Sequence, residues 1–300
     1  MTLTTAPRLL LVHAHPDDET LWTGGTIARY AAAGVQVTLV TCTLGEEGEV
    51  IPPELRGLDS AGADQLGGYR VGELNAACAA LGISDQRFLG GMGRWRDSGM
   101  AWQRYGRTAG ATADTHPRAL VADEPGRQAA LLEEILREVR PQVVVTYDSD
   151  GGYGHPDHVR AHEITLAAAE RVPGVERVFY AAPAASAVRE GLRKLAAVEG
   201  VPFTLPGEDD LPTVDDATVD TVIDITPVLE AKLDALRAHR TQVSLWTDES
   251  SGAAAYALSN GIGQPVLGGE YYVLGSGSGT PRTDLFEGLD VAGGAPLERR

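Results

Sequence analysis

An apolar run, a helical repeat and a second apolar run follow one another within the first forty residues, and this order constrains the fold most. Leu9–Val12 is a short apolar run, residues 20–33 carry apolar side chains at helical spacing, and Val35–Thr41 is rich in β-branched residues. Strand, helix and strand within about 35 residues form a βαβ unit, in which the strands are parallel and the crossover is right-handed. Ligands of such sheets bind outside the carboxyl ends of the strands.

The rest of the chain continues this alternation. Further helices are predicted at residues 61–81, 128–139, 156–170, 187–197 and 227–240, and further strands at 86–89, 143–147, 175–180 and 221–225. Residues 101–124 lack periodicity and are predicted to be an irregular excursion, and the tail with Gly275, Gly277 and Gly279 is predicted to be loop. We therefore expect an α/β fold with a Rossmann-like, mostly parallel sheet flanked by helices. Residues 1–183 would form this core, and residues 184–300 a smaller elaboration that completes a pocket within the same continuous domain.

The amino-acid composition limits the classes of partner that the protein is expected to bind. The 300 residues carry 42 acidic against 25 basic side chains, a net charge of −17. Nucleic acids and anionic lipid surfaces are recognised mainly through Lys and Arg, so we expect neither as a partner, and a small molecule is favoured. Only two cysteines occur, which fits a reducing compartment, and no secretory leader or membrane-spanning stretch is recognisable. A cytoplasmic protein is predicted, and its oligomeric state is not.

Two polar clusters carry the chemistry. His15–Glu19 (His-Pro-Asp-Asp-Glu) follows the first predicted strand, and His155–His158 (His-Pro-Asp-His) follows the apolar run at 143–145. Both would lie at the carboxyl edge of the sheet, where two histidines and a carboxylate could bind one Zn²⁺ and leave a coordination position open. The alternative is that the acidic residues after Pro16 cap the following helix, where carboxylates are also favoured. Capping does not explain the second cluster.

These clusters resemble those of the LmbE/PIG-L family of zinc-dependent N-acetylglucosamine deacetylases. The segments that carry the resemblance are Ala14–Glu19, Thr41–Glu49, Gln65–Arg70, Gly93–Met100, Gly151–His155 and His155–His158, and the likeness extends over about residues 8–162, with 254–260 and 270–273 also similar. The resemblance implies metal-dependent hydrolysis of the acetamide of N-acetylglucosaminyl-inositol, as in mycothiol biosynthesis. It implies Zn²⁺ as the cofactor, with Fe²⁺ as a possible substitute in the cell.

The resemblance also implies a role for individual residues. These are His15, Asp18 and His158 as metal ligands, Asp17 as general base toward the attacking water, Tyr153 and His155 facing the reacting amide, and Arg70, Asp97 and Glu49 contacting sugar or inositol hydroxyl groups. Asp157 is expected to orient an imidazole rather than to bind metal. The sequence leaves open whether His155 stabilises the oxyanion or protonates the departing amine. It also leaves open whether the three substrate residues are merely solvated loop charges or form ion pairs between loops.

Two other functions remain open at this point. A related amidase that acts on mycothiol S-conjugates would share both metal clusters. A sugar-binding protein without catalytic activity would share the ligands but would have no need of a base at Asp17.

Overall fold

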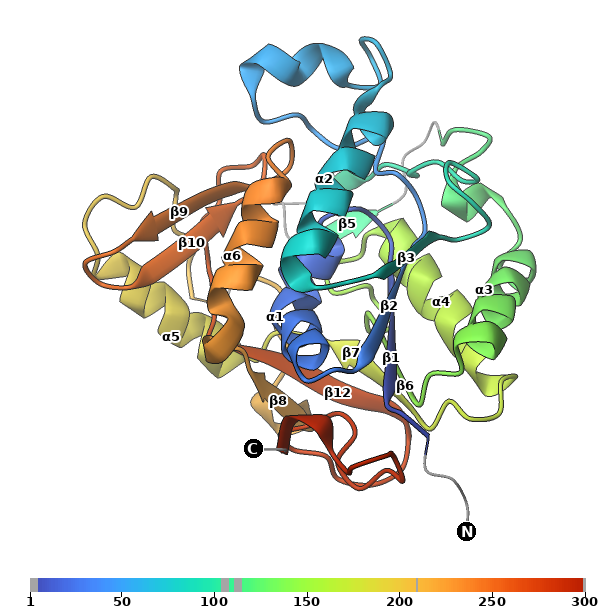
Figure 1. Cartoon of the computed structure of the whole chain (residues 1–300). Coiled ribbons are helices and arrows are strands. Elements are labelled where there is room, and N and C mark those ends of the chain that lie inside the picture. Colours follow the sequence, from blue (N-terminus) through green and yellow to red (C-terminus); the bar gives the residue numbers. More distant parts are fainter. Residues whose placement is uncertain (1–4, 104–107, 111–114, 209, 299–300) are drawn as a thin grey trace.

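The computed structural model describes residues 5–103, 108–110, 115–208 and 210–298. Its centre is a seven-stranded sheet in the order β3-β2-β1-β6-β7-β12-β8 (Figure 1). The strands are β1 (Arg8–His13), β2 (Gln36–Thr41), β3 (Asp85–Phe88), β6 (Val143–Thr146), β7 (Arg177–Ala181), β8 (Thr221–Asp224) and β12 (Gly269–Gly277). All neighbours from β3 to β7 are parallel, and β12 is antiparallel to both β7 and β8. The predicted α/β class with a mostly parallel sheet is confirmed.

Helices cover both faces of this sheet (Figure 1). They are α1 (Asp18–Ala32), α2 (Leu66–Leu81) and α6 (Leu229–Ala238) on one face, and α3 (Pro125–Val139) and α4 (Pro156–Glu170) on the other. The apolar run of β1 supplies both interfaces because alternate side chains of a strand point to opposite faces. Leu9 and Leu11 belong to the core beneath α1 and α2, whereas Leu10 and Val12 belong to the core beneath α3 and α4.

The order of the strands determines where a ligand-binding crevice is expected. From β1 the chain builds outward through β2 to β3, and it then returns to β6 on the other side of β1 before continuing to β7. The direction of winding therefore reverses between β1 and β6. At such a switch point the loops that leave the two strands diverge and open a crevice at their carboxyl ends. The two predicted clusters follow these two strands.

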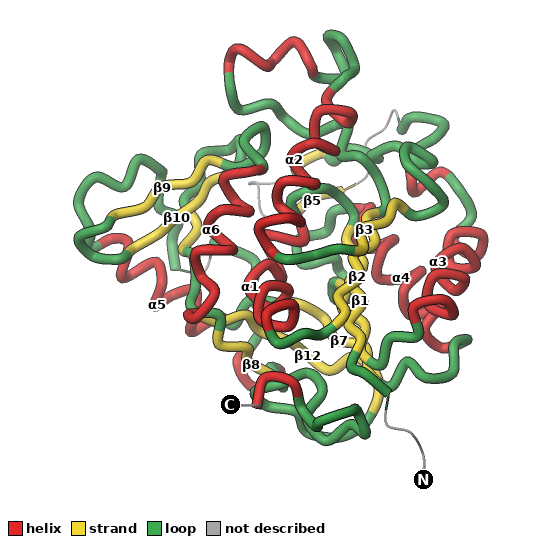
Figure 2. Tube along the Cα trace, in the orientation of Figure 1, coloured by secondary structure: helices red, strands yellow, loops and turns green. Residues whose placement is uncertain are grey.

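The C-terminal part extends the same sheet. After α5 (Ala185–Ala196) and α6, the chain forms a small antiparallel sheet of β9 (Ser244–Asp248), β10 (Ala253–Ala257) and β11 (Gln264–Pro265), visible beside α5 and α6 (Figure 2). It then returns as β12 between β7 and β8. Residues on both sides of position 183 thus contribute to one sheet. Among the described residues, no helix is both long and apolar enough to cross a bilayer.

Two sequence predictions were wrong. The glycine-rich tail was predicted as loop, but Gly275 and Gly277 lie in β12. A side-chain carbon at Gly275 would approach the Tyr180 ring to 2.1 Å, so glycine is required there by close packing and not by a turn. Within 101–124, β4 (Ala101–Gln103) pairs with β5 (Thr108–Gly110), in strands too short to show a period. The parts of that excursion at 104–107 and 111–114 lie outside the described residues.

Candidate active site

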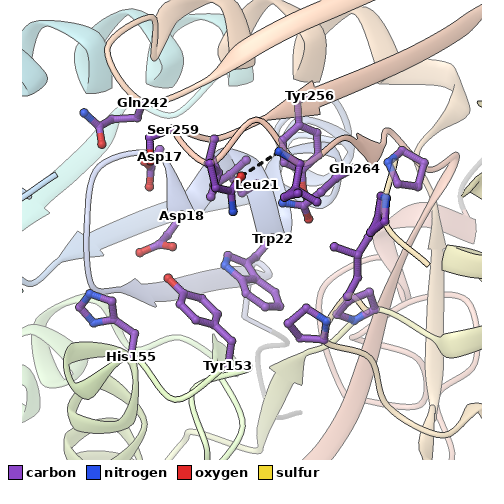
Figure 3. Close-up of a pocket in the computed structure, with 18 of the residues that line it drawn as sticks. Asp17, Asp18, Leu21, Trp22, Tyr153, His155, Gln242, Tyr256, Ser259 and Gln264 are labelled. Atoms are coloured by element: carbon purple, nitrogen blue, oxygen red, sulfur yellow. Dashed lines mark hydrogen bonds between the residues drawn. The ribbon is translucent and has the colours of Figure 1, made fainter. Parts of the chain in front are cut away.

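Both predicted clusters meet in one cavity of about 930 Å³ at the switch point. Figure 3 shows Asp17 and Asp18, from the loop after β1 and the start of α1, opposite Tyr153 and His155, from the segment between β6 and α4. Residues of the C-terminal part complete the wall. Gln242, Tyr256, Ser259 and Gln264 are among them (Figure 3). The cavity therefore joins the catalytic candidates of the core to the C-terminal elaboration.

The carboxylate of Asp18 lies close to both histidines that were predicted as metal ligands. The Oδ2 atom of Asp18 lies 3.3 Å from Nδ1 of His15 and 3.3 Å from Nε2 of His158. Apart from this contact with Asp18, the buried Nε2 of His158 has no hydrogen-bond partner among the described residues, while its Nδ1 lies 3.1 Å from the carbonyl oxygen of Gly151. A buried polar atom without a partner is costly. A metal ion bound at this nitrogen would satisfy it, and the Gly151 carbonyl would fix the ring in the orientation that binding needs.

The far side of His15 is held in the same way. Its Nε2 lies 3.2 Å from Oδ2 of Asp157, which is fully buried and also accepts the backbone N–H of Ser98 at 2.9 Å. Asp157 therefore occupies the position expected of a residue that orients an imidazole, with Nδ1 of His15 left for the metal.

The local charge favours a cation. Burial lowers the pKa of His15, but Asp97, Asp157 and Asp18 together raise it well above its ordinary value. Carboxylates that hold a proton on an imidazole will also favour a divalent ion in its place. Two imidazole nitrogens and one carboxylate oxygen form a donor set that suits Zn²⁺ and other transition metals. The residues gathered around His15 are therefore suited to a divalent metal ion.

A second donor set overlaps with the first. One nitrogen from each of His15, His155 and His158 lies within 4.8 Å of the others, so these three side chains could also hold an ion. The two sets differ in whether Asp18 or His155 supplies the third ligand. The Nδ1 atom of His155 already accepts the backbone N–H of Asp157 at 3.1 Å, which leaves only its Nε2 free.

Asp17 is set apart from its acidic neighbours. It is the N-cap residue of α1, yet its side chain makes no capping hydrogen bond. Instead, Asp18 accepts the N–H of His15 at 3.0 Å and Glu19 accepts the N–H of Asp17 at 2.9 Å. The capping alternative thus describes Asp18 and Glu19 in part, but not Asp17, whose carboxylate lines the cavity. Burial raises the pKa of Asp17 to about 7, the range that suits a general base at neutral pH.

Arg70 contacts the carboxylate of Asp17 directly. The sequence assigned Arg70 to the substrate, and the residue does line the cavity, but its side chain is buried. The guanidinium donates to Oδ2 of Asp17 at 2.9 Å, to the carbonyl of Gly45 at 2.7 Å and to that of Pro16. Three of its donors are therefore used inside the protein. The positive charge opposes the effect of burial and lowers the pKa of Asp17.

We expect Arg70→Met to move the acid limb of kcat/KM to higher pH. A general base at Asp17 would act as a carboxylate, so activity would fall as the pH drops through its pKa, and loss of the neighbouring positive charge raises that pKa. A bound metal ion lowers the same pKa, which places the limb of the metal-loaded protein below about 7. Rate measurements from pH 5 to 9 on metal-loaded protein test this. Arg87→Met, whose guanidinium pairs with Asp85 and Glu138, is the control, and an unshifted limb for Arg70→Met would contradict the prediction.

His155 and Tyr153 are both suited to donate hydrogen bonds. Burial, reinforced by the charges of His15 and His158, lowers the pKa of His155 to about 2, so its imidazole is neutral. Because Nδ1 accepts from the backbone of Asp157, the hydrogen of the neutral ring is assigned to Nε2. Burial also raises the pKa of Tyr153, which keeps its phenol protonated. A neutral ring with its hydrogen on Nε2 can donate a hydrogen bond, as stabilisation of an oxyanion requires; this is one of the two roles that the sequence left open for His155.

The other two predicted substrate residues lie at different depths. Asp97 is buried, with Oδ1 3.5 Å from Nε2 of His15 and 2.8 Å from the backbone nitrogen of Gly99. Burial opposes its ionisation, but the charge of His15 and the hydrogen bonds hold its pKa well below the ordinary value. Glu49 also lines the cavity, but it is exposed. Glu49 is therefore the more accessible of the two to a ligand that enters.

Sequence reasoning missed several residues of the site. Trp22 lies beside Asp18 and Tyr153 in the cavity (Figure 3), and its position four residues after Asp18 on a helix could have indicated this. Tyr147 stacks on His158 with ring centroids 4.1 Å apart, directly after β6. His239 is the C-cap residue of α6 and Gln242 follows in the next segment; neither carries a local sequence signal.

Comparison with known proteins identifies relatives of this chain. The family model described as PIG-L: GlcNAc-PI de-N-acetylase matches residues 10–169. A Saccharopolyspora erythraea protein named 1D-myo-inositol 2-acetamido-2-deoxy-alpha-D-glucopyranoside deacetylase 1 is 63% identical over 100% of both chains. An Actinosynnema mirum protein named as the same deacetylase is 62% identical over 96% of this chain and 99% of its own. The solved structure of a zinc-inhibited form of teicoplanin deacetylase shares the fold, with a TM-score of 0.52 and 21% identity over 90% of this chain and 100% of that one.

Fold and site together define a Rossmann-like α/β protein with a buried histidine–carboxylate cluster, suited to a metal ion, at the switch point of its sheet. The chain belongs to the PIG-L family of de-N-acetylases.

Proposed function

We propose that the protein hydrolyses the acetamide of N-acetylglucosaminyl-inositol and releases acetate and glucosaminyl-inositol, a step of mycothiol biosynthesis. The observation that carries this proposal is the extent of the likeness to the deacetylases of that compound. Identity of 63% covers the entire chain, and so includes the C-terminal residues that line the cavity as well as the two polar clusters. The likeness therefore extends over the segments that carry the predicted chemistry and over those that form the C-terminal wall of the cavity.

The metal is proposed to be Zn²⁺, with Fe²⁺ as the alternative in the cell, held by His15, Asp18 and His158. The convergence of Asp18 Oδ2 with one nitrogen of each histidine supports this set. When bound, a divalent ion there supplies Lewis-acid polarisation of the amide carbonyl and favours deprotonation of water.

The chain's own residues supply the proton transfers. Asp17 removes a proton from the attacking water while the water oxygen forms a bond to the amide carbon. The developing oxyanion accepts hydrogen bonds from Nε2–H of His155 and the phenol of Tyr153. When the C–N bond breaks, the proton held by Asp17 passes to the departing nitrogen, which leaves as the amine. Arg70, bonded to Asp17 at 2.9 Å, orients the carboxylate throughout.

The remaining residues are proposed to bind the sugar–inositol substrate. Asp97 and Glu49 line the cavity and offer acceptors for hydroxyl groups, as does Gln242 from the segment after α6. Residues 184–300 would complete the pocket of a single domain whose core is residues 1–183. Two free, buried cysteines are compatible with the cytoplasm as its location.

Acetate release is the direct test. We expect the metal-loaded protein to release acetate from N-acetylglucosaminyl-inositol with a kcat/KM at least ten times that for a mycothiol S-conjugate amide, assayed side by side. A preference for the S-conjugate would favour the amidase. Binding of the sugar–inositol without acetate release, equally tight with and without metal, would indicate a non-catalytic sugar-binding protein.

A further inference from the structure

We propose that His239 is a positioning residue for Asp17, and that it acts through the carboxylate of Glu19. The proposal rests on the proposed function, because it assigns a role in placing the general base. It also gives the C-terminal part of the chain a role in catalysis beyond lining the cavity.

The backbone of Asp17 is in an unfavourable conformation. Its φ of 108° and ψ of −33° lie outside the regions that a residue with a side chain ordinarily adopts. Such a conformation persists only where the surroundings hold it from several sides. In Asp17 the carbonyl accepts the N–H groups of Thr20 and Leu21, both at 2.9 Å, and Arg70 holds the carboxylate. The remaining backbone group, the N–H of Asp17, requires its own partner.

Glu19 is that partner. Its Oε2 accepts the N–H of Asp17 at 2.9 Å, and its Oε1 accepts the hydroxyl of Thr20 and lies 2.7 Å from Nε2 of His239. Glu19 is fully buried, so its carboxylate has no access to bulk solvent and is oriented by the groups around it. Of the three groups around it, only His239 comes from outside the loop and the first turn of α1. The imidazole therefore fixes the carboxylate from a separate element of the fold.

The contact with Glu19 is the one hydrogen bond of the His239 side chain among the described residues. It is the C-cap residue of α6, is fully buried, and its Nδ1 has no hydrogen-bond partner in the part of the chain that the structure describes. A buried ring that leaves one nitrogen unsatisfied incurs a cost. That cost is understandable if the other nitrogen has a specific task, and its partner at 2.7 Å is Glu19.

The segment around His239 is itself anchored to the helix that carries Arg70. The backbone N–H and the hydroxyl of Thr241 donate to the two oxygens of Glu73 in α2, at 2.9 and 2.7 Å. Glu73 is one turn after Arg70 on that helix, so both groups that hold Asp17 depend on one junction between α2 and the end of α6. Loss of the His239 imidazole alone would release Glu19, and with it the backbone N–H of Asp17. The contact between Arg70 and the Asp17 carboxylate would remain.

The test compares His239→Phe with His239→Gln in the metal-loaded protein. Phe keeps the ring and removes the donor, whereas the side-chain amide of Gln can still donate to Glu19. We expect His239→Phe to lower kcat by about 10- to 100-fold, since a small misplacement of a catalytic group has an effect of this size. We expect KM to stay within about twofold and the metal content per chain to remain that of the wild type, and His239→Gln to recover most of kcat.

Leu236→Ala is the control for a loss of stability alone. Leu236 is fully buried in the same helix, so its truncation lowers Tm, but we expect kcat of the folded protein to be unchanged. If His239→Phe does not fold, Glu19→Gln provides the second variant, with the same expected fall in kcat at constant KM. An unchanged kcat in a folded, metal-loaded variant overturns the proposal, and so does a loss of kcat that follows a loss of metal.

A crystal structure of His239→Phe separates this proposal from the proposed function. If the wild type releases no acetate from N-acetylglucosaminyl-inositol, the proposed function fails, but the position of Asp17 can still be compared. We expect φ of Asp17 to leave the region near 108° in the variant. Retention of the wild-type conformation would show that His239 does not position this residue.

Discussion

Asp17→Asn is expected to lower kcat by about 10³-fold, within the range that general acid–base catalysis contributes. The amide of Asn has nearly the shape of the carboxylate and can still accept from Arg70, so the loop keeps its conformation. It cannot accept a proton from water. The carboxylate that contacts His15 and His158 is that of Asp18 and not that of Asp17. The metal content of the variant should therefore stay at the wild-type level.

The measurement pairs kcat with metal stoichiometry on the same preparation. Asp85→Asn, at the start of β3 and paired with Arg87, is the matched control and should change neither quantity. A variant at Asp17 that turns over normally would remove the base from the mechanism. One that loses its metal would instead identify Asp17 as a ligand and leave the base unassigned.

The fold could be predicted where the apolar pattern is local and strong. Leu9–Val12 and the run at 143–145 are flanked by helical repeats, and both became parallel strands of the central sheet. The antiparallel half was harder to predict because its signals are not local. Gly275 and Gly277 belong to a strand whose glycines allow Tyr180 and Arg177 to approach closely, and no pattern within the strand reports those neighbours.

The site, like the fold, could be predicted only where its signals are local in the sequence. The two His-Pro-Asp clusters are contiguous in sequence, and parallel strands bring their carboxyl ends to one edge, so His15 and His158 could be expected to lie together. The hydrogen-bond partners of the individual side chains could not be predicted in this way. Arg70 was expected at a substrate hydroxyl and donates to Asp17, and His239 contacts Glu19 across 220 residues of sequence. Such contacts depend on how separate elements pack, which no spacing encodes.

Removal of the metal is expected to abolish acetate release, and addition of Zn²⁺ or Fe²⁺ to restore it. Substitution of a ligand should prevent that recovery. His158→Ala removes the orphaned Nε2 that faces Asp18, and we expect a loss of metal affinity greater than the 10- to 100-fold typical of groups that only orient a ligand. Metal content after dialysis and activity after reloading are the two readouts.

His162→Ala is the matched control for this prediction. It lies on α4 one turn after His158, is likewise buried, and its Nδ1 is 2.9 Å from the carbonyl oxygen of Tyr147 rather than in the cluster. Its removal should affect stability but leave metal recovery intact. Equal metal affinity in the two variants would contradict the assignment of His158.

The same measurement decides between the two overlapping donor sets. If Asp18 is the third ligand, Asp18→Asn loses the metal, because an amide oxygen binds Zn²⁺ far more weakly than a carboxylate. In that case His155→Gln keeps the metal and lowers kcat by about 10²- to 10³-fold, as expected when one oxyanion donor is removed. The reverse result, metal lost with His155 and kept with Asp18→Asn, would assign the site to the three histidines. Asp18 would then be the carboxylate beside the site, and the oxyanion would depend on Tyr153 alone.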